Sequence, residues 1–148
     1  MHHHIEVLEV QPAAVIRAHV AVDGIPTFLA GAFGDVIGVL AAQGLEVAGP
    51  PFARYAMSDR GFDVEAGFPS SAPVTPTGRV EAEELPGGPA IVILHRGPYD
   101  DVAADYRAGQ EWLAANRWTA TGAPWEVYLD GPEVAEPRTV VYLPCRPT

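Results

Sequence analysis

The sequence contains no lysine: all nine of its basic residues are arginines, against 19 acidic residues, which gives a formal net charge of −10 at pH 7. This balance excludes the basic patch on which nucleic-acid binding depends, so we expect no direct nucleic-acid binding. An acidic protein of this kind instead attracts cationic small molecules, although weakly.

Cysteine is also scarce, because Cys145 is the only one. A single cysteine excludes an intrachain disulfide framework and indicates a cytoplasmic location. The apolar share of 48% is not arranged in a run of the roughly 18–20 residues that span a membrane, so we expect no membrane segment. The sequence lacks the zinc-type Cys/His clusters, phosphate-binding glycine loops and serine nucleophile motifs of common enzymes, so we expect no metal and no cofactor.

What the sequence does contain is a repeated frame of the form Gly-x-Pro-aromatic-x-x-Tyr. It occurs at Gly49–Tyr55 and again, 73 residues later, at Gly122–Tyr128. Two copies of this length account for nearly all 148 residues, so we interpret the chain as one domain, residues 1–148, with repeat halves at about 5–77 and 78–148. Solenoids need about three repeats, and therefore a closed, pseudo-twofold pair of halves is the better interpretation.

Hydrophobic periodicity predicts the same element order, β-β-α-β-β, in each half. The expected helices cover residues 27–43 and about 97–117. The expected strands cover residues 5–9, 13–22, about 50–58, 62–68, 79–85, 90–95, 124–129 and 138–143. This order predicts an α+β fold with a mostly antiparallel sheet and two helices.

The strongest candidate for function is Glu126, an acid among aromatic and aliphatic residues. Side chains alternate along a strand, so Glu126 and Tyr128 share one face while Trp125 lies on the other. A buried carboxylate needs a partner, a proton or a cationic ligand. In the first half of the repeat, Ala53 is the counterpart of Glu126, while Tyr55 is the counterpart of Tyr128. The tyrosine is therefore repeated but the acid is not, so the duplicated fold does not require the acid. A surface acid, or an acid paired with arginine, is the alternative.

Other residues are weaker candidates. We expect Tyr55 and Tyr128 to face each other on the side of Glu126, where they stack on a ligand or serve as ordinary core tyrosines. Tyr106 points inward from the second helix, and Phe33 lies on a first helix that its glycines weaken. His95 is expected to make a structural hydrogen bond, and Glu65, opposite the apolar side of its strand, to be exposed to solvent.

Four segments together resemble the GyrI-like small-molecule-binding family, the effector-binding domain of AraC-type and MerR-type regulators. They are Gly49–Tyr55, Phe62–Pro69, His95–Asp100 and Pro124–Leu129, and the resemblance covers essentially the whole chain. It implies a duplicated SHS2-type fold with a ligand cleft between the halves. It also implies that Glu126, in the Trp-Glu-x-Tyr motif, binds cationic aromatic ligands.

The resemblance leaves three functions open. The favoured one is a standalone protein that binds cationic or amphipathic aromatic compounds for multidrug sensing or sequestration, using Glu126, Tyr55, Tyr128, Tyr106 and Phe33. The second is a hydrolase of cyclopropane-bearing, DNA-alkylating natural products, in which Glu126 and Tyr55 would be catalytic. The third is an interaction protein acting on gyrase, for which no motif is present. A function like that of a haem-binding relative of the same fold is a further reading, but no histidine is clearly placed as an axial ligand.

Overall fold

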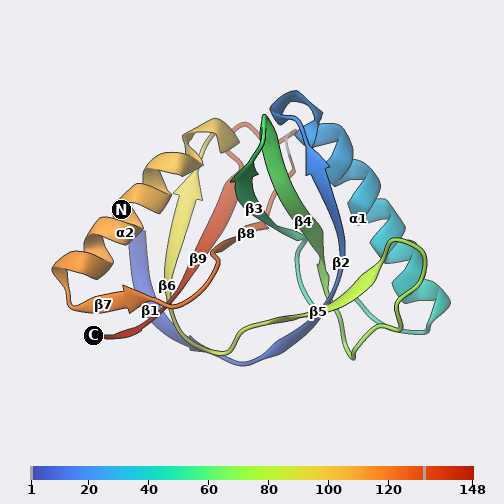
Figure 1. Cartoon of the computed structure of the whole chain (residues 1–148), viewed down its shortest axis with the longest axis horizontal. Coiled ribbons are helices and arrows are strands. Elements are labelled where there is room, and N and C mark those ends of the chain that lie inside the picture. Colours follow the sequence, from blue (N-terminus) through green and yellow to red (C-terminus); the bar gives the residue numbers. More distant parts are fainter. Residues whose placement is uncertain (1, 132) are drawn as a thin grey trace. The chain divides into compact units, whose positions relative to one another are not determined.

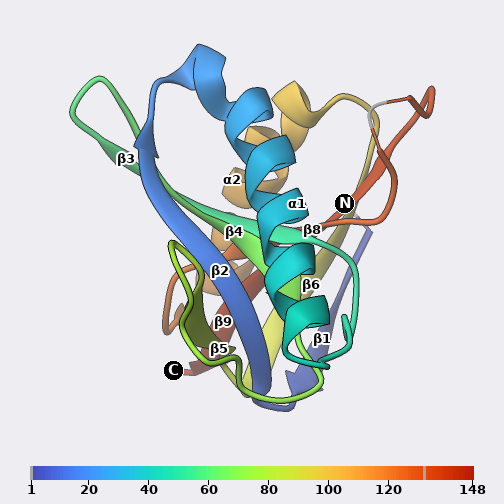
Figure 2. The ribbon, with the colours of Figure 1, turned by 90° about the vertical axis from the view of Figure 1, so that its right-hand side faces the viewer.

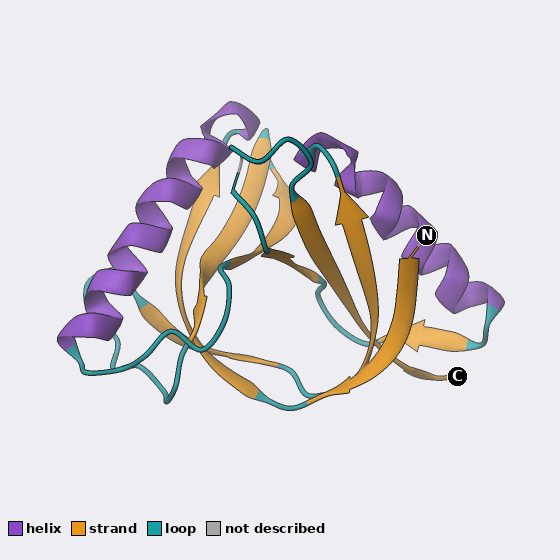
Figure 3. Ribbon diagram, turned by 180° about the vertical axis from the view of Figure 1, so that it is seen from behind, coloured by secondary structure: helices purple, strands orange, loops and turns teal. Residues whose placement is uncertain are grey.

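The computed structural model describes residues 2–131 and 133–148. The chain forms two compact units. One consists of Met1–Val10 with Pro86–Thr148 and is called here the Glu126 unit; the other consists of Gln11–Leu85 and is called the Tyr55 unit. Both contain one long helix and antiparallel strands, which confirms the predicted α+β class (Figure 3).

The Tyr55 unit contains a four-stranded antiparallel sheet in the order β3-β4-β2-β5. Its α1 helix packs against β2 and β4, as Figure 2 shows, and buries a stripe of Ala32, Val36 and Leu40 at fourfold spacing. The elements are β2 (Gln11–Val20), a 3₁₀ turn (Val22–Gly24), α1 (Ile25–Ala42), β3 (Phe52–Ser58), β4 (Gly61–Pro69) and β5 (Glu81–Leu85).

The Glu126 unit contains antiparallel strands in the order β1-β6-β9-β8, and the short strand β7 pairs with the end of β9. Its α2 helix contacts β6, β7 and β9 (Figure 1). The elements are β1 (His2–Leu8), β6 (Gly88–Arg96), a 3₁₀ turn (Tyr99–Asp101), α2 (Val102–Ala115), β7 (Trp118–Ala120), β8 (Trp125–Tyr128) and β9 (Arg138–Pro147). Strand β7 was not expected from the sequence.

The two units have the same topology, in which β3, β4, β2 and β5 correspond to β8, β9, β6 and β1. The compact units nevertheless differ from the two repeat halves of the sequence. The first strand of each half pairs with strands of the other half, since β1 pairs with β6 and β5 pairs with β2. Each unit is therefore completed by a strand from the neighbouring repeat.

The number of residues that separates equivalent positions of the two halves differs before and after the helices. In the middle of each sheet Ile16 and Ile93 are equivalent, and their numbers differ by 77, whereas Ala53 and Glu126 differ by 73. The helices account for the difference, because α1 has 18 residues and α2 has 14. The 73-residue offset that the sequence suggested therefore does not hold for the strands before the helices, because α2 is about one turn shorter than α1.

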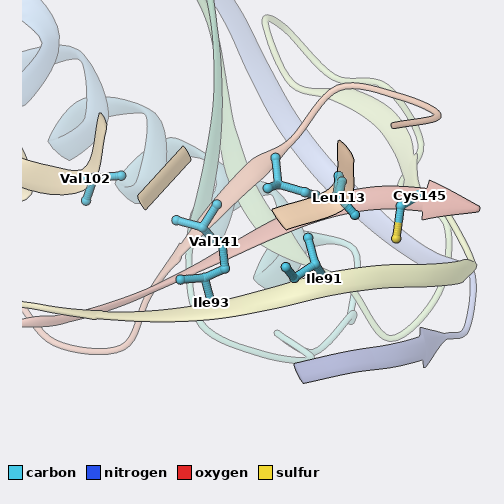
Figure 4. Packing of buried hydrophobic residues seen from close by; sticks show 7 residues of the cluster. Ile91, Ile93, Val102, Leu113, Val141 and Cys145 are labelled. Carbon is cyan, nitrogen blue, oxygen red and sulfur yellow. The ribbon is translucent and has the colours of Figure 1, made fainter. Parts of the chain in front are cut away.

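The core of the Glu126 unit lies between α2 and one face of its sheet, and Figure 4 shows its buried side chains. Alternate residues of β6 and β9 point to this face and meet the apolar side of the helix. Each buried aliphatic side chain contributes roughly 1.5–3 kcal/mol relative to exposure. The cluster consists of Ile91, Ile93, Val102, Leu113, Val141, Leu143 and Cys145.

All four helix ends differ from the sequence expectation, by one to five residues. Helix α1 begins at Ile25, two residues before the expected start, and is capped by Gly24 without a side-chain hydrogen bond. Helix α2 begins at Val102 after a 3₁₀ turn and ends at Ala115, two residues before Arg117, whose φ of 61° cannot continue a helix. Gly44, with φ of 71°, follows α1 as expected of a residue that ends a helix.

One helix passes a simple length and composition test for a membrane span. Val22–Ala42 is long and apolar enough to cross a membrane by length and composition alone, with a mean hydropathy of 1.7. A core helix passes the same test, and α1 packs on β2 and β4. The hydropathy of this helix is therefore weak evidence for a membrane.

Candidate functional site

Glu126 lies on β8, on the side of the sheet that faces α2. Its direct cross-strand partner is Val141, a member of the core cluster that packs against this helix. The neighbouring residue Trp125 points to the opposite side, where its ring stacks on Tyr142 with centroids 5.2 Å apart and an interplanar angle of 8°. Strand alternation therefore places an acid, with 9% of its surface exposed, under the helix.

Two tyrosine hydroxyls donate hydrogen bonds to the Glu126 carboxylate, one to each oxygen. The Tyr106 hydroxyl, from α2, donates to Oε2 at 2.9 Å, and the Tyr128 hydroxyl, from β8 itself, donates to Oε1 at 2.9 Å. Both donors are neutral, so they orient the carboxylate without cancelling its charge. This arrangement differs from an exposed acid and from an acid paired with arginine, the two alternatives considered from the sequence.

Burial is the dominant influence on the ionisation of Glu126. It raises the pKa of the carboxyl above its ordinary value of 4.5, against the opposing effects of the two tyrosine hydrogen bonds and of the nearby His95. The charged form is thus held in surroundings that solvate it less well than water does. A cation that enters beside Glu126 would relieve this cost.

His95 lies on β6 near the same site and is also buried. Its Nε2 donates to the carbonyl oxygen of Pro98 at 2.9 Å, and its Nδ1 contacts the carboxylate of Asp105 on α2. The structural hydrogen bond expected for His95 is therefore present. In the sheet, Thr139 pairs with both His95 and Tyr128, so the three residues form one row across β6, β9 and β8.

Tyr99 adds a further aromatic surface. Its ring meets that of Tyr128 edge to face, with centroids 5.7 Å apart, and its hydroxyl donates to the backbone oxygen of Asp130 at 2.8 Å. Burial and the charges of Glu133 and Asp130 raise the pKa of Tyr99, so its hydroxyl stays protonated at neutral pH. The site thus combines one carboxylate with three tyrosines.

Two predicted site residues belong to the Tyr55 unit. Tyr55 on β3 pairs with Val64 and meets Phe62 edge to face at 6.2 Å, and it corresponds by position to Tyr128. Phe33 on α1 meets Phe68 edge to face at 5.6 Å. Both therefore lie on the helix side of their own sheet, and their participation in the site of Glu126 stays a prediction.

Glu65 was expected to be exposed, and this expectation is wrong. Only 14% of its side chain is accessible, because Arg17 from the adjacent strand β2 donates to it at 2.9 Å. The same guanidinium reaches Glu81 at 2.8 Å and Glu83 at 2.6 Å on β5. Glu65 therefore belongs to an ionic cluster of the Tyr55 unit.

A groove of about 500 Å³ also occurs in the Tyr55 unit, between α1 and the segment before β5. It contains none of the predicted site residues. Its lining is Ile16, Gly34, Asp35, Gly38, Val39, Ala42, Gln43 and Thr77 to Val80.

Sequence reasoning missed two residues near this site, Asp105 and Thr139. Thr139 is fully buried beside Tyr128, and its hydroxyl has no hydrogen-bond partner among the residues that the structure describes. The only signal for Asp105 was its position in the first turn of the helix, next to Tyr106. That position is also typical of an acid that interacts with the helix dipole, so it did not single out a contact with His95.

The comparisons with known proteins identify the family. The family model of the GyrI-like small molecule binding domain matches residues 1–146, and the chain therefore belongs to this family of small-molecule-binding domains. None of the curated proteins that were compared matches the chain.

Solved structures share the fold at low sequence identity. The C-terminal domain of EcmrR is 20% identical, with a TM-score of 0.85, and the match covers 99% of this chain and 98% of that one. In an EcmrR–DNA complex, this chain spans only 58% of the length of the EcmrR chain, with 21% identity, 99% coverage of this chain and a TM-score of 0.85.

Two further structures carry functional descriptions. A hydrolase encoded by lin2189 from Listeria innocua is 12% identical, with a TM-score of 0.71 and coverage of 97% of this chain and 91% of that one. SAV2435 bound to tetraphenylphosphonium is 14% identical, with a TM-score of 0.65 and coverage of 99% and 94%. At these identities, the likeness shows the fold alone.

Proposed function

We propose that this protein binds organic cations that carry aromatic groups, with Glu126 as the counter-charge. The observation that carries the proposal is a buried carboxylate whose two hydrogen-bond donors, Tyr106 and Tyr128, are both neutral. Multidrug sensing or sequestration in the cytoplasm is the physiological setting that we propose. The single cysteine is consistent with that compartment.

The chemistry of the site selects for charge and for aromatic surface together. A lipophilic cation loses little hydration on entering an apolar site, and it gains a full charge–charge interaction with a poorly solvated carboxylate. The rings of Tyr99, Tyr106 and Tyr128 offer faces and edges to such a ligand, and a cation over a ring face gains about 0.5–2 kcal/mol. Inorganic cations do not gain these apolar contacts, so we expect them to bind poorly.

Tetraphenylphosphonium is a suitable test ligand because its charge is surrounded by four aromatic rings. We expect saturable binding in isothermal titration calorimetry, with a 1:1 stoichiometry. Tetraphenylborate has the same shape and the opposite charge, and should bind at least about tenfold more weakly, a difference of 1.4 kcal/mol. Equal affinity for the two ions would contradict a role for Glu126 as counter-charge.

Cation binding should depend on pH in a defined direction. Because burial raises the pKa of Glu126, the carboxyl becomes protonated at a higher pH than an exposed glutamate does. Phosphonium affinity should therefore be greatest at neutral pH and above, and fall as the pH is lowered through the raised pKa of Glu126. Dissociation constants measured across that range for the wild type and for Glu126→Gln would test this, since the variant should show no such fall.

A second candidate function is hydrolysis of cyclopropane-bearing, DNA-alkylating compounds. The observation that favours it is the contact of a carboxylate of raised pKa with two phenols, since such a carboxylate can accept a proton from water while a tyrosine donates one. Tyr55 would also be a candidate proton donor in that reaction. We favour the binding function because it requires only the aromatic rings of the tyrosines, whereas hydrolysis also requires proton transfer by a hydroxyl.

Replacing tyrosine by phenylalanine separates the two functions, because it removes the hydroxyl and keeps the ring. Under the binding proposal, Tyr55→Phe and Tyr128→Phe should retain phosphonium affinity at pH 8 to within about 1 kcal/mol, the contribution of a typical hydrogen bond. For a hydrolase, at least one of them should lose turnover by about 10²-fold while still binding substrate. The measurement is single-turnover cleavage of a cyclopropane-bearing alkylator, with equilibrium binding of the same compound as its control.

A further inference from the structure

We propose that His95 and Asp105 are a positioning pair that holds Tyr106 within hydrogen-bonding reach of Glu126. The inference rests on the proposed function in one respect: it matters for ligand binding because Glu126 is the proposed binding group. The contacts themselves lie within the Glu126 unit, on β6, α2 and β8.

The first step is that the His95 ring has one orientation. The Pro98 carbonyl oxygen can only accept a hydrogen bond, so the proton on this side belongs to Nε2. The contact between Nδ1 and the Asp105 carboxylate needs a second proton between the two groups. With both nitrogens occupied, the ring cannot turn without breaking two interactions, and its position fixes that of Asp105.

The second step is that Asp105 fixes the rotation of α2 about its own axis. The buried residues of this helix are Val102, Gly109 and Leu113, with Tyr106 and Trp112 packed beside them, and these apolar contacts are less directional than a hydrogen bond. A tyrosine hydroxyl lies up to about 8 Å from the helix axis, so a rotation of about 15° moves it by about 2 Å. Such a movement would break the 2.9 Å hydrogen bond between Tyr106 and Glu126.

The third step is that the two anchors lie on different strands. In the order β6-β9-β8, His95 holds Asp105 at one strand, while Tyr106, the next residue of α2, reaches Glu126 two strands away. A helix held at both strands cannot tilt or rotate freely over the sheet. His95 therefore acts on the ligand site through Tyr106, besides the direct charge effect by which it favours ionised Glu126.

The test uses Asp105→Leu, which removes the carboxylate and leaves a side chain of similar size, together with Tyr106→Phe and the double variant. The pKa of Glu126 is followed by carboxyl carbon NMR, with Glu126→Gln for assignment, so no ligand is needed. Loss of the Tyr106 hydrogen bond should raise this pKa, whereas mere loss of a neighbouring negative charge should lower it. A weaker direct charge effect of His95 would also raise it, but that rise would add to the rise from Tyr106→Phe in the double variant. We expect Asp105→Leu to raise it as Tyr106→Phe does, and the double variant to show no further rise.

Three further arms make the result decisive. Asp105→Asn keeps a hydrogen-bonding partner for His95 and should lie between the wild type and Asp105→Leu; it also carries the test if Asp105→Leu does not fold. Glu111→Leu, an exposed acid on the same helix, should leave the pKa of Glu126 unchanged. In phosphonium binding, the pH at which affinity falls should move upward equally in Asp105→Leu and Tyr106→Phe.

A lower pKa of Glu126 in Asp105→Leu would overturn the proposal, and so would effects of Asp105→Leu and Tyr106→Phe that add in the double variant. Absence of phosphonium binding by the wild type would refute the proposed function instead, while the NMR titration would still decide whether the pair positions Tyr106.

Discussion

Glu126→Gln is expected to weaken the binding of tetraphenylphosphonium by at least about tenfold, or 1.4 kcal/mol, at pH 7. The variant keeps the size of the side chain and an oxygen that accepts a tyrosine hydrogen bond, and removes only the charge. Because this carboxylate is buried, its interaction with a bound cation is screened less than that of a surface acid. Calorimetric titration of the purified variant provides the measurement.

The same substitution should not destabilise the protein, and this distinguishes loss of a binding group from loss of structure. A folded-state pKa above the unfolded value means that the folded protein favours the protonated carboxyl. That stability is fully present below the unfolded pKa and is lost as the pH rises through the folded pKa. At pH 7 the neutral amide therefore avoids a cost, and the free energy of unfolding in urea should be unchanged or higher.

Glu111→Gln is the matched control for this experiment, because it removes the same charge from an exposed position on α2. It should alter phosphonium affinity by much less than Glu126→Gln does. A similar loss of affinity in both variants would show that the general acidity of the protein attracts the cation, and that Glu126 has no special role.

Gly67→Ala is expected to destabilise the protein by at least about 2 kcal/mol. Gly67 lies on β4 between Phe52 on β3 and Val15 on β2. A Cβ atom there would collide with the backbone carbonyl of Ala14, and strand backbone cannot move aside as a flexible side chain can. Urea unfolding followed by circular dichroism should show the lower stability.

Gly34→Ala gives the opposite expectation and serves as the control. A Cβ atom at Gly34, in the interior of α1, meets no other atom within 4 Å. Alanine is favoured over glycine inside a helix by about 0.5–1 kcal/mol, so this variant should be slightly more stable than the wild type. If Gly67→Ala were as stable as Gly34→Ala, the close approach of β2 and β4 at this point would be contradicted.

The side-chain directions within a strand and the repeated order of elements could be predicted from the sequence. The alternation in β8 places Glu126 and Tyr128 on one side and Trp125 on the other, and the hydrogen bond of Tyr128 and the stacking of Trp125 agree with it. The repeated frame around Tyr55 and Tyr128 likewise predicted two units of similar topology. Periodicity suffices here because a strand or helix fixes the directions of its own side chains.

Features that depend on pairing between distant residues were decided only by the tertiary structure. Glu65 is half-buried beside Arg17, which precedes it by 48 residues and lies on the adjacent strand, and a side chain at Gly67 would collide with β2. The exchange of β1 and β5 between the repeats and the contact of His95 with Asp105 have the same origin. The local sequence determined on which face of its strand or helix each residue lies. Strand register and helix placement determined which side chains that face contacts. The sequence could not predict these contacts, because long-range contacts leave no periodic signal in the chain.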